Sequence, residues 1–592
     1  MHFFFFLTLI FLFSLFLFLT SHQSRLQTSW QHPHFPARTA AQTAPAVRTL
    51  ANPAAPTAAL SSECQKAHWP IHKIHCKSSL NSDSWKPGWV LQHRNPVFAP
   101  GSQVPPNNRR GGVTWILGSV PALDVLKLDA NEGESYQGKL SLLFAASSDL
   151  RNVVKTIAQL PPDWDQPIDI TINDRDLNIV GRNAIILLIT LTSDDDEQAI
   201  DCIIHAWYSS FIRKSDQAVL EQRIRPLIQA VCDKTMGKPD NRILGKTWVF
   251  GKRSLRLVLA KGAWDKLLSF VKTPSGLTME MANHYRKAVT LAESERDFLD
   301  RHYVFIPPSH RVAKQRFRED GVLQPFGVGR GEFTVPNPTL FHVPSSWPME
   351  YSCEPLDGWS AKDVEMTQHG PATSDIYGRL FTYLLSVLKD FMSHIANKNI
   401  SFQLLHLNAP NLLDHLKKGS FDRIEVSNIS DKAYLGVNVT VAVMVPLLRS
   451  STVNPRATLI TRFMGAIQEN MTSEDRLGFD KLDEIVTSLE GYLPEPPLPT
   501  TTWDTVIIKW MFASDLVRTF DHVFDRIARK LEFDKFPEFL NVGIKDEHTI
   551  IDKWRFRLKL KPGQKGAQEE FDRMMMGQGV TGKELYLEWK RV

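Results

Sequence analysis

The stretch "KLSLLFAASSDLRNVVKTIAQL", residues 139–160, decides the fold that this sequence predicts. Its first half is a short apolar run that ends in small residues, which is typical of a buried β-strand. Ser148 or Asp149 can cap the segment that follows, in which apolar residues recur at the spacing of one helical face. The stretch therefore predicts a strand, a loop of small residues and a helix.

Neighbouring segments repeat this order. A second strand, "PIDITIND" (167–174), precedes a helical pattern at 175–191, and strands return downstream in "SFQLLHLNA" (401–409), "FDRIEVSNIS" (421–430) and "ATLITRFM" (457–464). Alternating strands and helices predict an α/β fold with a parallel sheet. We expect one Rossmann-like sheet built from residues 113–235 and 399–592, with a large, mostly helical insertion at 236–398.

Polar residues follow each predicted strand, and the carboxyl ends of parallel strands meet at one edge of a sheet, where α/β proteins bind nucleotides. The loop at 145–149 contains no glycine, so it lacks the close backbone approach of a G-x-G-x-x-G loop. Each of these residues has an alternative role as a helix cap or turn residue, and no catalytic set is evident. The candidate cofactor-binding residues are Ser147, Ser148, Asp149, Asp174, Asn408, Ser427 and Asn428.

Length and composition describe an ordinary globular protein of two to four domains, because 592 residues exceed a single compact core. The net charge of +5 leaves no electrostatic footprint for nucleic acid. Five widely spaced cysteines are not a disulfide framework and indicate a reducing compartment, the cytoplasm or the nucleus.

The N-terminal region has a different character. Residues 3–19, "FFFFLTLIFLFSLFLFL", are long enough for the core of a secretory signal and short for a spanning helix. Residues 1–20 are thus either a signal or membrane anchor, or a wrongly assigned first exon. Residues 21–62, rich in Ala, Thr, Pro and Gln, predict disorder, and 78–112 predict a linker with a few anchoring aromatic side chains.

Between these regions, residues 63–77 read "ECQKAHWPIHKIHCK". Cys64, His72 and Cys76 are candidate zinc ligands, and the spacing of the last two places them one helical turn apart. The segment resembles the C-terminal end of a MYND-type zinc finger, whose final Cys, Trp, His and Cys fall on Cys64, Trp69, His72 and Cys76. The preceding ligand position of that family is Leu60, and residues 1–63 contain no cysteine. We expect a partial finger with an incomplete zinc site.

A second resemblance covers most of the chain from residue 78 onward. It rests on "GSVPALDVLKLDANEGESYQGKLSLLFAASSDLRNVVKTIAQLP" (118–161), "DITINDRDLNIVGRNAIILLITL" (169–191), "FDRIEVSNISDKAYLG" (421–436) and "TIIDKWRFRLKLKPGQKGAQEEFDRMM" (549–575). These stretches resemble an uncharacterised fungal family, the domain of unknown function 4470, which often carries a MYND finger. The family shares its domain with the N-terminal region of dynein axonemal assembly factors. The resemblance implies a Rossmann-like domain similar to S-adenosylmethionine-dependent methyltransferases, with no known activity. The family's loop usually resembles "GDLRN", whereas Ser148 precedes Asp149 here.

Two functions stay open. The chain is either a non-catalytic adaptor that binds partner proteins through the finger and the α/β domain, or an S-adenosylmethionine-dependent transferase. The glycine-free loop favours the adaptor. A membrane association is expected only if residues 3–19 are a true leader.

Overall fold

In the computed structural model, the described residues are 73–99, 115–193, 197–343, 345–370, 372–477, 482–493, 503–577 and 581–592. The expected leader, the expected disordered tail and the candidate ligands Cys64 and His72 lie outside them. So do residues 100–112 of the expected linker and residues 113–114 of the first α/β block. Within the described part, no helix has both the length and the apolar character that a membrane span requires.

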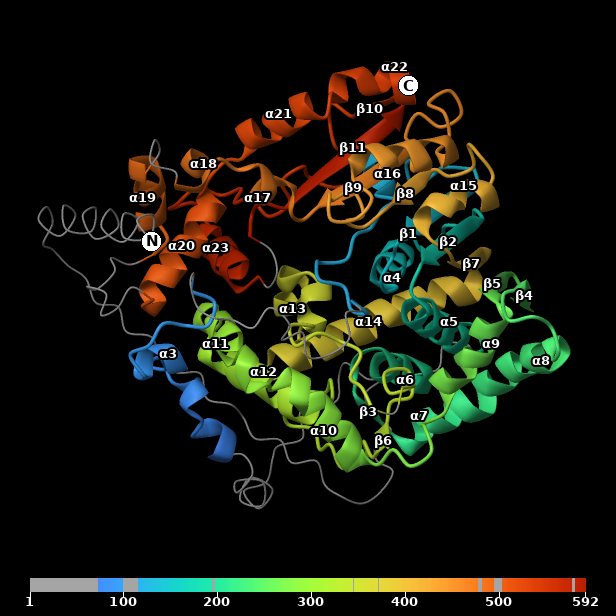
Figure 1. Ribbon diagram of the computed structural model, residues 1–592, viewed down its shortest axis with the longest axis horizontal. Helices are drawn as coiled ribbons and strands as arrows, with labels where there is room; N and C mark the ends of the chain where they lie inside the picture. Colours follow the sequence, from blue (N-terminus) through green and yellow to red (C-terminus); the bar gives the residue numbers. More distant parts are fainter. Residues whose placement is uncertain are drawn as a thin grey trace, which may run out of the picture.

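One nine-stranded sheet organises the chain, in the order β10-β11-β9-β8-β1-β2-β7-β5-β4 (Figure 1). Neighbours from β9 to β5 pair in parallel, and the pairs β4–β5, β9–β11 and β10–β11 are antiparallel. A separate two-stranded ribbon joins β3 (Phe211–Ile212) to β6 (Val335–Pro336). The strands of the large sheet are β1 (Leu140–Ala145), β2 (Ile168–Asp174), β4 (Ile243–Phe250), β5 (Arg253–Ala260), β7 (Ile400–His406), β8 (Arg423–Glu425), β9 (Thr458–Phe463), β10 (Val542–Ile544) and β11 (Leu585–Arg591).

The chain winds the sheet in two directions from β1. After β2 the chain forms β4 and β5 at the outer edge of the sheet, comes back to β7 beside β2, and then crosses to β8 and β9 on the other side of β1. The two predicted α/β blocks therefore share one mixed sheet. The direction of winding changes between β1 and β8, where Phe144 lies opposite Glu425.

The sheet has a hydrophobic core on each face, because successive side chains of a strand point to opposite faces. Leu142 and Phe144 of β1 belong to the core under α4 (Arg151–Ala158), α5 (Leu177–Leu191) and α14 (Ile376–Asn397). Leu143 and Ala145 belong to the core under α16 (Val437–Met444) and α21 (Asp521–Lys530). These helices lie on the two sides of the sheet in Figure 1.

The segment expected to be a mostly helical insertion is only partly so. Its residues 243–260 form the hairpin β4–β5, which joins the sheet next to β7 and was not foreseen as strands. The remaining α-helices, inside and outside this segment, are α3 (Gly88–Leu91), α6 (Glu197–Tyr208), α7 (Lys214–Ala218), α8 (Arg225–Thr235), α9 (Lys261–Leu267), α10 (Met279–Thr290), α11 (Arg296–Phe305), α12 (Pro308–Asp320), α13 (Ala361–Met366), α15 (Leu412–His415), α17 (Ala466–Asn470), α18 (Ser473–Leu477), α19 (Leu482–Glu490), α20 (Thr505–Val517), α22 (Phe536–Leu540) and α23 (Ala567–Met576).

Residues 78–99, the described part of the expected linker, pack against the folded body. Trp89 is 1% exposed and its indole N–H donates to the carbonyl oxygen of Trp503 at 2.9 Å. Arg94 donates to both carboxylate oxygens of Asp297, at 2.6 and 2.7 Å. A buried aromatic and a bidentate ion pair thus hold this segment in place.

Candidate functional site

The carboxyl ends of β1, β2, β7 and β8 form the edge at which an open α/β sheet binds ligands, and the winding changes direction there. All seven candidate residues lie at this edge. Ser147, Ser148 and Asp149 form the β1–α4 loop, and Asp174 is the last residue of β2. Asn408 follows β7, and Ser427 and Asn428 follow β8.

Asp174 and Ser148 are brought into direct contact. The amide of Ser148 donates to one carboxylate oxygen of Asp174 at 3.2 Å, and the amide of Asp176 donates to the other at 2.9 Å. Asp174 is 6% exposed, and this burial raises the pKa of its carboxyl to about 6. Both oxygens are therefore already occupied by the chain itself.

The β1–α4 loop turns sharply although it lacks glycine. Ala146 (φ 52°) and Ser148 (φ 60°) both adopt left-handed backbone conformations, which residues with a Cβ seldom take. The amide of Ser147 donates to the carbonyl of Asn173 at 3.0 Å. The amides of Ser147 and Ser148, which would face a bound anion in a phosphate-binding loop, are thus used within the protein.

A segment that precedes β1 lies across this loop. We call residues 115–118 the covering segment. Ser148 donates its hydroxyl to the carbonyl of Trp115 at 2.6 Å, and the amide of Gly118 donates to the carboxylate of Asp149 at 2.8 Å. Ile116 and Leu117 within the segment are 2% and 4% exposed. The covering segment is therefore bonded directly to the loop at two points.

Asp149 also forms a buried ion pair that was not predicted. Its carboxylate contacts the guanidinium of Arg151 at 2.5 Å and accepts from the Arg151 amide at 3.3 Å. The side chains are 4% and 3% exposed, respectively. The expectation that Ser148 or Asp149 caps this helix is wrong, because α4 begins at Arg151 with Leu150 as its N-cap. Arg151 also donates to the carbonyl of Val120 at 2.9 Å, which ties α4 to the chain beyond the covering segment.

Across the edge, Ser427 is held by its neighbours. Its amide donates to Glu425 at 2.8 Å, and its hydroxyl accepts from Arg462 at 2.7 Å. Asn408 and Asn428 lie in turns, where their carbonyl oxygens accept from amides three residues further on. Glu425 and Arg462 were missed because they lie inside strands, whereas the prediction took residues that follow strands. Arg151 lies within the stretch 139–160, only two residues beyond Asp149, so its ion pair with Asp149 could have been predicted from the sequence.

S-adenosylmethionine, the cofactor that the methyltransferase resemblance implies, does not fit this arrangement. The amides of Ser147 and Ser148, the Asp149 carboxylate and both oxygens of Asp174 already form hydrogen bonds within the chain, and the covering segment is bonded to the loop. The grouping of residues was foreseen from the strand ends, but their hydrogen bonds to the covering segment were not.

Of the candidate zinc ligands, only Cys76 belongs to the described residues. It closes a single helical turn at 73–76, and burial raises the pKa of its thiol. A zinc ligand is a thiolate, which a raised pKa disfavours. The part of the chain that the structure describes holds no cluster of three His, Cys, Asp or Glu side chains suited to a metal. With Cys64 and His72 outside that part, the incomplete zinc site remains a prediction.

Comparison with known proteins gives one family. Residues 116–212 match the model of a family described as Domain of unknown function (DUF4470). The match runs from the covering segment through β1, α4, β2, α5 and α6 to β3, so it includes both the loop and most of the segment that covers it. No curated protein matches the chain. No solved structure matches it either. The domain at 116–212 is thus similar to a family whose function its description leaves open.

Proposed function

We propose that this chain is a non-catalytic protein-interaction protein, an adaptor. In this proposal its sheet resembles that of a methyltransferase, and residues of the chain itself close the crevice that would hold the cofactor. The observation that carries the proposal is the closure of the β1–α4 loop by the covering segment, through Ser148 and Asp149. The amides of Ser147 and Ser148 and the Asp149 carboxylate already have partners, so a new polar ligand would only exchange hydrogen bonds with these groups.

The strand order supports the methyltransferase-like part of this proposal. The order β7-β2-β1-β8-β9 is that of a doubly wound nucleotide-binding sheet. The reversed strand β11, inserted between β9 and β10, is typical of the methyltransferases that the sequence resembles. In this proposal the sheet is retained as a scaffold rather than as a cofactor site.

The outer edge of β4 supplies a surface for a partner. This strand of eight residues ends the sheet and pairs with β5 on one side only. Ile243 and Val249 are 52% and 69% exposed along it. An exposed strand edge can accept an extended segment of another protein through main-chain hydrogen bonds.

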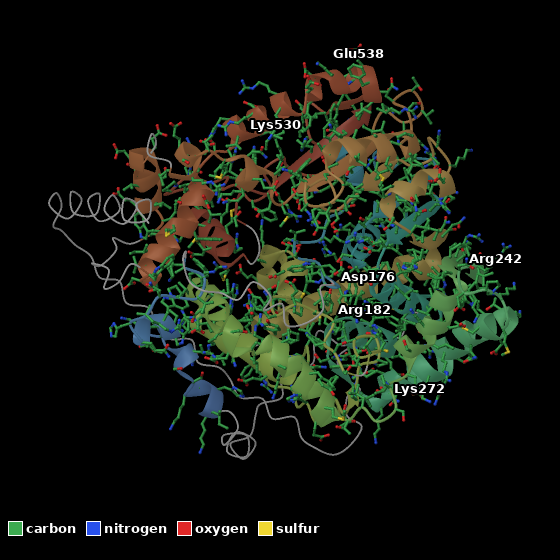
Figure 2. All side chains as sticks on the ribbon, in the orientation of Figure 1. Asp176, Arg182, Arg242, Lys272, Lys530 and Glu538 are labelled. Carbon is green, nitrogen blue, oxygen red and sulfur yellow. The ribbon has the colours of Figure 1, made fainter. Side chains whose placement is uncertain are left out.

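Charge indicates what kind of segment this edge would take. Between Asp240 and Asp265 the sequence contains six basic residues and no acidic one. Arg242, at the start of the hairpin, lies on the outer rim of the molecule in Figure 2. We therefore infer an extended acidic segment with alternating apolar residues as the partner, because opposite charge steers and orients such contacts.

Fluorescence anisotropy with the full-length chain tests this interaction. The probes are a labelled peptide of alternating Glu and Val and its Lys–Val counterpart. We expect the Glu peptide to bind at least about tenfold more tightly, and Arg256→Glu to abolish that preference. Lys272→Glu, an exposed lysine away from the hairpin strands, is the matched control and should leave binding unchanged. Equal binding of the two peptides, or full binding by Arg256→Glu, would refute the β4 edge as the interaction site.

One observation favours the transferase as a second candidate. Ser147 Oγ and Asn173 Oδ1 are buried at this edge without a hydrogen-bond partner among the described residues. Unsatisfied polar atoms are costly and often mark a place that a bound molecule completes. This alternative requires the covering segment to move aside, and direct titration with S-adenosylmethionine separates the two functions.

A further inference from the structure

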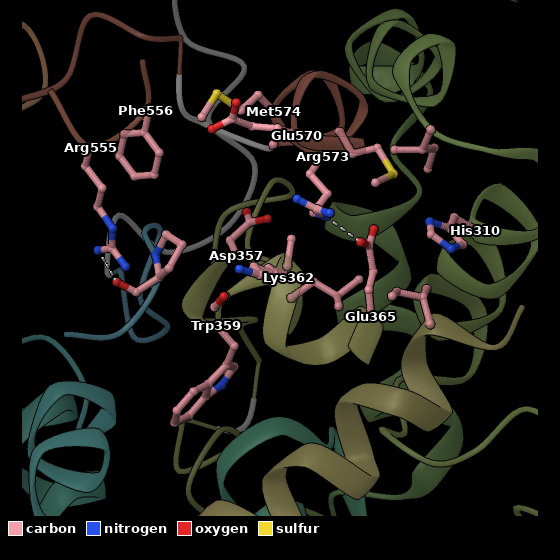
Figure 3. Close-up of a pocket in the computed structure, with 18 of the residues that line it drawn as sticks. His310, Asp357, Trp359, Lys362, Glu365, Arg555, Phe556, Glu570, Arg573 and Met574 are labelled. Atoms are coloured by element: carbon pink, nitrogen blue, oxygen red, sulfur yellow. Dashed lines mark hydrogen bonds and ion pairs between the residues drawn. The ribbon is translucent and has the colours of Figure 1, made fainter. Parts of the chain in front are cut away.

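A cavity of about 330 Å³ lies away from the candidate site, where the insertion meets the C-terminal part of the chain (Figure 3). Its walls come from α12, α13, the segment around Arg555 and Phe556, and α23. None of the seven candidate residues lines it. Its size is within the range of small-molecule sites.

Most of the cavity wall is apolar. Its side chains come from segments far apart in the sequence, so no local pattern announces them. Such a wall favours a hydrocarbon group, since burial of apolar surface is the main driving force for binding it. The principal apolar side chains are Ile306, Leu356, Trp359, Ile376, Leu516 and Phe556.

Several charges of the wall are neutralised by the protein itself. Arg573 pairs with Glu365 at 2.9 Å, and Lys314 contacts Glu354 at 3.3 Å. Glu570 accepts from the amide of Leu560 at 2.9 Å. Arg573 and Lys314 thus need no ligand to balance their charges, whereas Glu570 has no cation within ion-pair distance among the described residues.

Arg555 differs from these groups. Its guanidinium donates to the carbonyls of Pro121 and Ala122, at 2.8 and 3.3 Å, but no carboxylate of the described residues lies within ion-pair distance. Burial lowers its pKa, the neighbouring Tyr586 hydroxyl opposes this effect, and the guanidinium groups of Arg151 and Arg462 add to it. The cavity wall therefore contains a guanidinium without a counter-charge in its surroundings.

Two further groups face the same space. Figure 3 shows Asp357 and Lys362 between Arg555 on one side and the Glu365–Arg573 pair on the other. Burial raises the pKa of Asp357 well above its ordinary value. Burial lowers the pKa of His310 to about 4, so its ring is neutral. Arg555 and Lys362 are thus basic side chains of the wall that have no carboxylate within ion-pair distance among the described residues.

We propose that this cavity binds a medium-chain amphipathic carboxylate, with its alkyl chain against the apolar wall and its carboxylate against Arg555. A carboxylate matches the planar fork of a guanidinium and would supply the missing counter-charge. Lys362, in the same wall, adds a second cation. None of the candidate cofactor-binding residues lines this site, and it does not depend on the adaptor proposal.

Isothermal titration of the full-length chain with decanoate, decanol and decylamine tests the proposal. We expect one decanoate per chain, bound at least about tenfold more tightly than decanol or decylamine. Arg555→Gln should remove the preference for decanoate over decanol. Arg557→Gln is the matched control, because Arg557 lies two residues away and pairs with Asp521 at 3.0 Å.

Filling the cavity provides a second test. Met574→Trp should abolish binding of decanoate, and Ala361→Phe, at an exposed position of the wall, should do the same if the first variant fails to fold. The absence of saturable decanoate binding would overturn the proposal. So would tighter binding of decylamine, or a carboxylate preference that survives Arg555→Gln.

Discussion

Replacing Asp149 with Asn perturbs the contact on which the closed crevice depends. The Asp149 carboxylate accepts from the Gly118 amide and balances the Arg151 guanidinium, which is 3% exposed. Asparagine keeps one acceptor oxygen and removes the charge. Arg151 is then a buried cation whose remaining bond in the described contacts is to the carbonyl of Val120.

The magnitude follows from the burial of this pair. Removing one partner of a buried ion pair costs about 3–5 kcal/mol, because the other charge stays buried and uncompensated. Arg151 keeps its bond to Val120 and a favourable interaction with Glu425, so we take the lower end, about 3 kcal/mol. Opening of the covering segment would let water reach the unpaired Arg151 guanidinium. The loss of about 3 kcal/mol therefore applies to the closed state and not to the open state, and the equilibrium shifts toward opening. Since each 1.4 kcal/mol corresponds to about a factor of ten, opening should become about 100-fold more frequent.

Amide hydrogen exchange of the full-length chain, followed by mass spectrometry of peptides that span residues 115–122, measures this opening. Asp149→Asn should accelerate exchange there by about 100-fold. Asp129→Asn, at an exposed carboxylate nearby, is the control and should change exchange by less than about threefold. Adding Arg151→Met to Asp149→Asn should restore most of the protection, because removing both partners leaves no buried charge.

Two outcomes would refute this reasoning. If the covering segment of the unmodified chain exchanges its amide hydrogens as fast as a free peptide does, the segment does not close the loop. An Asp149→Asn variant that exchanges within about threefold of the unmodified chain would mean that the ion pair does not hold the segment.

Three further predictions concern Asp174, Gly118 and the candidate zinc site. The pKa of the Asp174 carboxyl is raised from 3.8 to about 6, so its contribution to the free energy of unfolding is full below pH 3.8 and is lost as pH rises through 6. Unfolding measured at a series of pH values should show the free energy of unfolding fall by about 3 kcal/mol across this range. Asp174→Asn should remove this pH dependence. A Cβ at Gly118 would overlap the guanidinium of Arg151, so Gly118→Ala should accelerate exchange of the covering segment as Asp149→Asn does, whereas unchanged exchange would contradict the packing. Metal analysis of the purified chain should find far less than one zinc per chain, and a full equivalent that His72→Ala removes would show a complete finger.

Local patterns predicted the elements, and strand geometry predicted where polar residues gather. The stretch 139–160 predicted β1, the loop and α4. The downstream strands join the same sheet, as expected for apolar parallel strands that are covered by helices on both faces. The hairpin β4–β5 was missed because the mostly helical, proline-rich surroundings dominated the interpretation of 236–398. The run "TWVF" (247–250), made of β-branched and aromatic residues and followed by Gly251, is the signal that was available in the sequence.

The closure of the loop was beyond prediction from the sequence. It depends on Trp115 and Gly118 meeting Ser148 and Asp149, about thirty residues further along, and no periodicity or motif links the two segments. The absence of glycine suggested a tight capped turn, and the structure adds that Ala146 and Ser148 bend the backbone as glycine would. The cavity beside Arg555 likewise joins distant segments, so only the folded chain reveals it.

Titration of the full-length chain with S-adenosylmethionine, by isothermal calorimetry, tests the central claim most directly. The account predicts no saturable binding up to about 1 mM ligand, because the loop and Asp174 are already bonded within the chain. Binding of one equivalent with a Kd below about 100 µM, weakened at least about tenfold by Asp174→Ala, would contradict it and establish an open cofactor site.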